Sequence, residues 1–255
     1  NPHMFHIEAA NSMYMQAVGS YLLKENLVEG KKWYWLTADC AFGHDLLNVA
    51  KALMEKNGGK LVGGQSIPTD ASDFSRFLRK IRQARPDTVI LNLAGNQISG
   101  FLTQYFEHGL PFPVVGFTFD TAAGWGVGKG KFSGVWPLAW HHLVDTPTSK
   151  RYAEAFTKKY GKPPENQSWA NYFALRIVAQ SIAEKKSTDP IELTEHLRLE
   201  AKFDIGKTRE GYFRAYDNQM MMEMYAVRAK RAADAKDQWD IFKVLGTVPA
   251  ANGDL

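Results

Sequence analysis

The sequence has a single cysteine, Cys40, among its 255 residues. One thiol cannot form an internal disulfide, and it leaves the redox compartment undecided. No stretch approaches the roughly 18 consecutive apolar residues of a membrane-spanning helix, so we expect no direct membrane span. No charged segment followed by an apolar one opens the chain, so we expect any signal peptide to lie outside it.

Neither sign of charge is in large excess. The chain has 31 Lys and Arg against 27 Asp and Glu, a net charge of +4, and the two signs alternate along it. This pattern disfavours nucleic acid as a partner, because nucleic-acid binding needs clustered basic residues. With 45% apolar and 23% charged residues, the composition is that of a globular protein and not of a disordered chain.

The sequence also lacks the patterns that mark common enzyme and metal sites. The glycines from Gly124 to Gly130 match neither GxxxxGK followed by Ser or Thr nor GxGxxG. Cys40, His44 and Asp45 have the residue types of a nucleophile, a base and an orienting group, but Cys40 precedes the expected helix and nothing supplies an oxyanion hole. Two histidine pairs lack further ligands at metal-binding spacing: His3 with His6, and His141 with His142. We therefore expect no enzymatic activity, no metal and no cofactor.

What the sequence does contain, from Lys32 to Trp136, is an alternation of short apolar runs with amphipathic segments. Such alternation is typical of βα units around a parallel sheet that is buried on both faces. The expected strands are 33–36, 61–67, 88–93, 114–116 and 132–136; the expected helices lie around 46–53, 74–81 and 98–105, after a first helix at 11–25. The fold class predicted is therefore α/β, with a doubly wound, mostly parallel sheet.

After about residue 140 the pattern changes to helices without an apolar strand. Pro147 opens one helix, a second covers 168–184, and Asp189 with Glu192 forms a capping box before a third. We expect the second helix to bury its stripe of Tyr172, Leu175, Ala179 and Ile182. Three such helices need a sheet to cover, and this segment supplies none. Residues 222–228 and 239–245 then predict a β-hairpin.

Three loops follow expected strands, and in a doubly wound sheet ligands bind outside the carboxyl ends of the strands. These loops are 37–43, 94–97 and 117–121. They offer an aromatic ring (Phe42), amide and hydroxyl groups (Asn96 and Thr118) and one carboxylate (Asp120). Together with helix N-terminal N–H groups, this set suits a small polar organic molecule, and nothing in it is arranged for catalysis.

Several short stretches, in this order, resemble the leucine/isoleucine/valine-binding family, which are type I periplasmic substrate-binding proteins of ABC importers. They are FHI at 5–7, LTADCAFGHD at 36–45, DFS at 73–75, RPDTVI at 85–90, HGL at 108–110, YGKPP at 160–164 and RAYDNQ at 214–219. The stretch around Phe42 is similar to the branch that handles amides or aromatic acids. The resemblance implies a periplasmic solute-binding protein that captures a small ligand between two lobes and delivers it to permease subunits.

The resemblance also implies roles for individual residues. Phe42, just before Gly43, matches the family's aromatic ligand contact. The family's later tyrosine falls near Ala94 and its amino-group-binding acid near Thr118, so two features specific for amino acids are absent. Asp120 is a candidate substitute, with Phe119 as a second stacking ring. Independently of the resemblance, Trp169 is a further aromatic candidate, because it is expected at a loop position beside the strand ends. An aromatic acid, an amide or an amino-acid-like molecule is expected as the ligand.

By the same resemblance, residues 1–138 and 219–255 form the second lobe, and 139–218 form the helical remainder of a first lobe whose sheet lies in a preceding segment. The helices between 147 and 200 then expose an apolar face, which predicts self-association. Two alternatives stay open: a ligand-sensing receptor domain of the same fold and, less favoured because GxGxxG and GxSxG are absent, a Rossmann-like enzyme.

Overall fold

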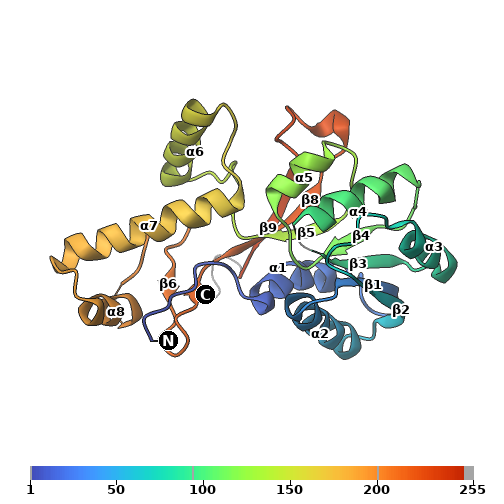
Figure 1. Cartoon of the computed structure of the whole chain (residues 1–255), viewed down its shortest axis with the longest axis horizontal. Helices are drawn as coiled ribbons and strands as arrows, with labels where there is room; N and C mark the ends of the chain where they lie inside the picture. The colour runs from blue at the N-terminus through green and yellow to red at the C-terminus, as the bar shows by residue number, and fades with distance from the viewer. Residues whose placement is uncertain (1, 94, 200, 250–255) are drawn as a thin grey trace. The chain divides into compact units, whose positions relative to one another are not determined.

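The computed structural model describes residues 2–93, 95–199 and 201–249, and these residues divide into two compact units (Figure 1). The larger unit contains Asn11–Leu138 and Tyr225–Val248. The smaller unit contains the described residues of Asn1–Ala10, Ala139–Met224 and Pro249–Leu255. No helix among the described residues is both long enough and apolar enough to cross a lipid bilayer.

In its described residues the larger unit contains a seven-stranded sheet with the strand order β2-β1-β3-β4-β5-β8-β9. Neighbouring strands from β2 to β5 are parallel, and β8 runs antiparallel to β5. The strands are β1 (Lys32–Ala38), β2 (Lys60–Ile67), β3 (Thr88–Asn92), β4 (Val114–Gly116), β5 (Val135–Leu138), β8 (Met224–Ala229) and β9 (Phe242–Val248). This confirms the expected α/β fold class with a mostly parallel sheet.

Helices cover both faces of this sheet, because a parallel sheet is buried on both faces (Figure 1). They are α1 (Asn11–Lys24), α2 (Ala41–Lys56), α3 (Ser75–Ala84), α4 (Asn96–Glu107) and α5 (Thr121–Val127). On one face, Trp33 of β1 and Ile90 of β3 pack with Leu22 of α1 and Leu46 of α2 in one buried cluster. Because side chains alternate along a strand, the residues next to Trp33 and Ile90 in the sequence point to the opposite face of the sheet.

The smaller unit is mainly helical. Its helices are α6 (Pro147–Tyr160), α7 (Asn166–Lys185) and α8 (Pro190–Leu199), and its strands β6 (Tyr212–Phe213) and β7 (Met220–Met221) form a two-stranded sheet. At the start of each helix a side-chain oxygen accepts hydrogen bonds from N–H groups of the first turn, as N-cap residues do. Thr146 accepts from the Ser149 amide for α6, Glu165 caps α7, and Asp189 accepts from two amides at the start of α8.

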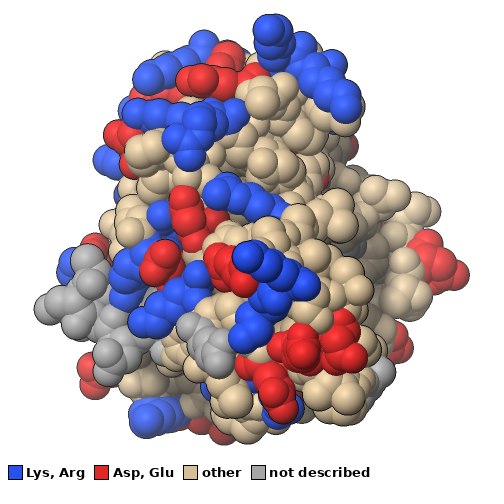
Figure 2. All heavy atoms as spheres, turned by 90° about the vertical axis from the view of Figure 1, so that its left-hand side faces the viewer, with Lys and Arg blue, Asp and Glu red and all other residues tan. Residues whose placement is uncertain are grey.

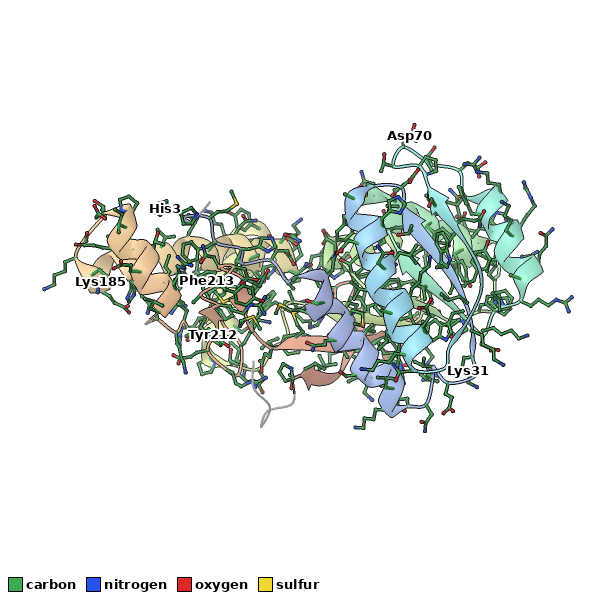
Figure 3. All side chains as sticks on the ribbon, turned by 90° about the horizontal axis from the view of Figure 1, so that it is seen from below. His3, Lys31, Asp70, Lys185, Tyr212 and Phe213 are labelled. Carbon is green, nitrogen blue, oxygen red and sulfur yellow. The ribbon has the colours of Figure 1, made fainter. Side chains whose placement is uncertain are left out.

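Two short segments that the sequence assigns to the second lobe group with the smaller, helical unit in the structure. Residues 2–10 and 219–224 belong to the smaller, helical unit. The His6 amide donates to the Asn218 carbonyl at 3.0 Å, and Gln219 Nε2 donates to the Glu8 carbonyl at 2.8 Å. The Phe5 ring packs edge-on against Phe213 at 4.9 Å, and Figure 3 shows Phe213 on the same side of the molecule as His3. These long-range pairings hold the segments to the helices; the assignment of the units to lobes stays a prediction.

The prediction for the buried face of α7 was wrong. Tyr172, Leu175 and Ala179 are exposed, and Leu175 retains 75% of its accessible surface. The helix instead buries a stripe that includes Trp169, Phe173 and Ile177. Because α7 carries apolar residues all around, periodicity alone does not identify which stripe faces the rest of the unit. The consequence is an uncovered apolar face on the smaller unit.

Candidate functional site

The strand order places a topological switch point between β1 and β3. From β1 the chain passes through α2 to β2 on one side, and then returns through α3 to β3 on the other side of β1. Thr37 pairs in register with Asn92, and Leu91 with Gly116, so β1, β3 and β4 end at the same edge of the sheet. Asp70, which follows β2, marks this edge in Figure 3, and Lys31, which precedes β1, marks the opposite one. Ligands bind at such an edge in doubly wound folds.

The first loop at this edge connects β1 to α2 and carries Phe42 and Gly43. The Phe42 side chain is 38% exposed in the first turn of α2, so its ring is available to a ligand. A Cβ on Gly43 would lie 2.1 Å from the Ala38 carbonyl oxygen, which explains why this position holds a glycine. Thr37 Oγ1 donates to the Gly43 carbonyl at 2.7 Å and ties the loop to the end of β1. The local structure thus presents Phe42 on a firmly held turn.

The second loop connects β3 to α4. Asn96 is the first residue of α4 and is exposed; Gly95 precedes it with a φ of 54°, a conformation that glycine adopts readily. Ala94 lies outside the described residues. Gln97 Nε2 donates to the Pro68 carbonyl at 2.6 Å, which links this loop to the end of β2. Asn96 is therefore placed at the same edge as Phe42.

The third loop follows β4, and its candidate residues differ in whether they face the edge of the sheet or the core. Thr118 and Asp120 are partly buried, and Asp120 Oδ1 accepts a hydrogen bond from the Ala122 amide at 3.0 Å as the N-cap of α5. Phe119 points the other way. Its buried ring packs against Trp136 at 4.5 Å and Phe242 at 5.2 Å, so it belongs to the core. The structure contradicts the expectation of a stacking ring here, because side chains alternate along this extended loop.

Trp169, the remaining candidate, lies in the smaller unit and is completely buried. Its ring stacks on Trp140 at 6.3 Å, and its Nε1 donates to the Ile205 carbonyl at 2.7 Å. The ring and its N–H group are thus used in packing within the smaller unit, which corrects the expectation that Trp169 contacts the ligand.

One polar residue at the edge was missed from the sequence. Asn92 ends β3 and is fully buried, and among the described residues neither amide atom of its side chain has a hydrogen-bond partner. Such groups are rare because leaving a buried amide without a partner costs free energy. The signal was available: Asn92 is an amide at the end of an otherwise apolar strand.

The side chains considered for catalysis have contacts that differ from the expected ones. His44 Nε2 lies 2.9 Å from Asp39 Oδ1, and Asp45 Oδ2 accepts from Asn11 Nδ2 at 2.6 Å, so the carboxylate beside His44 is Asp39 and not the expected Asp45. The stretch from Gly124 contributes to α5 and its end. In the part of the chain that the structure describes, no three His, Cys, Asp or Glu side chains come together as metal ligands.

Comparison with known proteins shows the family. A family model described as "Periplasmic binding protein" matches residues 1–236. The Leu/Ile/Val-binding protein homolog 7 of Brucella suis biovar 1 (strain 1330) is 23% identical over 223 residues, which is 84% of this chain and 54% of the relative.

Two solved structures are similar over nearly the whole chain. A periplasmic binding protein from Burkholderia mallei has a TM-score of 0.86 at 26% identity, with 98% of this chain and 66% of that one covered. An amino acid ABC transporter substrate-binding protein from Pseudomonas fluorescens Pf-5 has a TM-score of 0.87 at 26% identity, with coverages of 97% and 66%. This chain therefore spans about half the length of the curated relative and about two thirds of the solved ones. With the family model matching residues 1–236 and these solved structures superposing over nearly the whole chain, the chain belongs to the periplasmic binding protein family.

Proposed function

We propose that this chain is the ligand-binding portion of an extracytoplasmic solute-binding protein of an ABC importer. It takes a small organic molecule at the edge where β1, β3 and β4 end. The observation that carries the proposal is that Phe42, Asn96 and Asp120 stand at this shared edge beside the switch point of the sheet. Capture between two lobes and delivery to permease subunits are parts of the same proposal.

The ligand class follows from the groups at the edge. Phe42 offers the exposed part of a ring to an apolar or aromatic face of the ligand. Asn96 both donates and accepts hydrogen bonds through its amide, and Thr118 does so through its hydroxyl. No acid stands at Thr118, where the family resemblance places the group that binds an amino nitrogen. We therefore favour an aromatic carboxylate or an amide over a zwitterionic amino acid.

A thermal-shift screen tests this function. The probes are benzoate, benzamide and leucine, added to this chain and to a longer form of the protein, because a ligand of the native state raises the melting temperature. At a concentration about 100 times the dissociation constant, the stabilisation is about 2.7 kcal/mol. We expect the aromatic probes to shift the melting temperature and Phe42→Ala to abolish the shift.

Phe106→Ala is the matched control, because Phe106 is also an exposed phenylalanine but lies near the end of α4. Its shift should equal that of the unmodified protein. No shift in either form of the protein, or an equal loss in both variants, would contradict the proposed site.

We also propose that 139–218 are the helical remainder of a first lobe, and that 1–138 and 219–255 form the second, with the short segments 2–10 and 219–224 held to the helices. The support is the uncovered face of α7, where Leu175, Val178 and Tyr172 are exposed. Beside it, α6 and α7 enclose a pocket of about 550 Å³. It is lined by Thr148, Arg151, Tyr152, Ala155, Phe156, Lys159, Tyr160, Ser168, Tyr172 and Arg176.

Figure 2, which faces the side of Figure 1 on which α7 and α8 lie, shows uncharged surface between lysines, arginines and acids. The exposed apolar side chains of α7, which are Tyr172, Leu175 and Val178, mark an interface. The sheet of the first lobe is its proposed occupant.

A further inference from the structure

Lys207 is a buried lysine whose amine lies beside the segments through which the chain leaves the smaller unit. Only 5% of the residue is exposed. Its Nζ donates hydrogen bonds to the Ala139 carbonyl and, at 2.7 Å, to the Glu223 carbonyl. The chain passes between the two units at 138/139 and again at 224/225. One ammonium group thus holds two connecting segments that are more than 80 positions apart in the sequence.

The next two residues extend this arrangement. The buried Glu223 carboxylate accepts from the Thr208 amide at 2.8 Å and from Thr208 Oγ1 at 2.6 Å, and Arg209 Nε lies 3.4 Å from it. Arg209 Nη2 donates to the Pro249 carbonyl at 2.9 Å, next to the passage at 248/249. Residues 207–209 are therefore bonded to the chain beside three passages between the units.

A buried aromatic ring lies beside the Lys207 side chain. Its Nζ lies 4.9 Å from the centroid of the buried Trp169 ring, which is itself fixed by the Ile205 carbonyl. Burial lowers the pKa of Lys207 to about 7, against the opposing attraction of Glu223 and Glu8. An apolar side chain of similar length would avoid this cost, since buried ion pairs are often replaced without loss of stability. A buried lysine that costs free energy is a candidate for a role other than stability.

We propose that residues 207–209 form a clasp that fixes the connecting segments at the margin of the smaller unit, with Lys207 as the positioning residue. Holding these segments together restricts the backbone rotations that let the two units move relative to one another. The consequence for ligand capture rests on the proposed function. The clasp itself is a property of the free protein and is tested without ligand.

The test measures the distance between two spin labels by pulsed electron paramagnetic resonance. In a Cys40→Ser background, Lys56→Cys on α2 and Lys185→Cys on α7 place one label on each unit at exposed positions. We expect Lys207→Met to broaden the distance distribution. The control is Lys202→Met, an exposed lysine five positions earlier, which should leave the distribution unchanged.

Hydrogen exchange supplies the second readout. Peptides covering 136–141 and 222–226 should exchange about tenfold faster in Lys207→Met, as expected when a hydrogen bond worth about 1.4 kcal/mol is lost. Arg209→Met should likewise raise the exchange rate of the peptide that extends to Pro249. A merely structural lysine would change the melting temperature without widening the distances. Unchanged distances and unchanged exchange in a folded Lys207→Met variant would overturn the proposal, whatever the ligand screen finds.

Discussion

The stability of this protein should rise with pH between about 7 and 10 because of Lys207. Burial lowers the pKa of this lysine in the folded chain to about 7, whereas the unfolded chain keeps the ordinary value near 10.4. Between the two values only the unfolded state holds the extra proton, so deprotonation favours the folded state. The slope approaches about 1.4 kcal/mol per pH unit, and the whole window contributes up to about 4 kcal/mol.

The measurement compares urea unfolding of the unmodified chain and of Lys207→Met at several pH values from 6 to 9.5. Methionine does not titrate, and the other groups contribute equally to both proteins. The free energy of unfolding of the unmodified chain should therefore increase relative to that of the variant as the pH rises above 7. Below pH 6.5 the difference between the two free energies should be constant. Lys202→Met should show no such trend, because Lys202 is exposed. A difference that stays flat or falls between pH 7.5 and 9.5 would refute the reasoning.

Three further predictions concern single positions. Gly43→Ala should destabilise the larger unit by more than about 2 kcal/mol in urea unfolding, because its Cβ meets the Ala38 carbonyl at 2.1 Å; Gly126→Ala, which meets nothing within 4 Å, should be neutral or better, and equal effects would contradict this. Asp120→Ala should cost about 1 kcal/mol through loss of the α5 cap, and Asp120→Asn should restore most of it. Light scattering should show self-association of the chain that Leu175→Lys reduces; a monomer at all concentrations would exclude an adhesive α7 face.

The fold was predictable because its signals are local. The apolar run after Pro86 became β3, the three-residue run 114–116 became β4, and the helix after Pro147 begins at that proline. Asp189 caps α8 as its position in the sequence predicts. Each of these depends on residues within one element or one turn, where propensity, periodicity and capping act together.

The site was predictable only to the level of loops. The positions of Phe42, Asn96 and Asp120 at one edge follow from the parallel strand order, which the βα pattern indicates. The direction of a side chain within a loop does not follow from that pattern. Phe119 and Asp120 are neighbours, and the first joins the ring cluster around Trp136 while the second caps α5. A loop position therefore identifies candidates, and alternation decides which of them reach the edge.

Two buried polar residues show what lies beyond sequence reasoning. Within the described part of the chain the side-chain amide of Asn92 has no hydrogen-bond partner, and Lys207 has carbonyl partners that come from Ala139 and Glu223. Lys207 does not stand out by local pattern, and the sequence marks Asn92 only as an amide at the end of an apolar strand, because the burial of both is created by the packing of distant segments. Both kinds of group cost free energy to bury, and a fold that needed only stability would replace them with apolar side chains. Asn92 ends a strand at the proposed ligand edge, and Lys207 belongs to the proposed clasp on the segments that join the units. Substitution of Asn92 should therefore change ligand binding, and substitution of Lys207 should change the motion of the units, while the protein still folds.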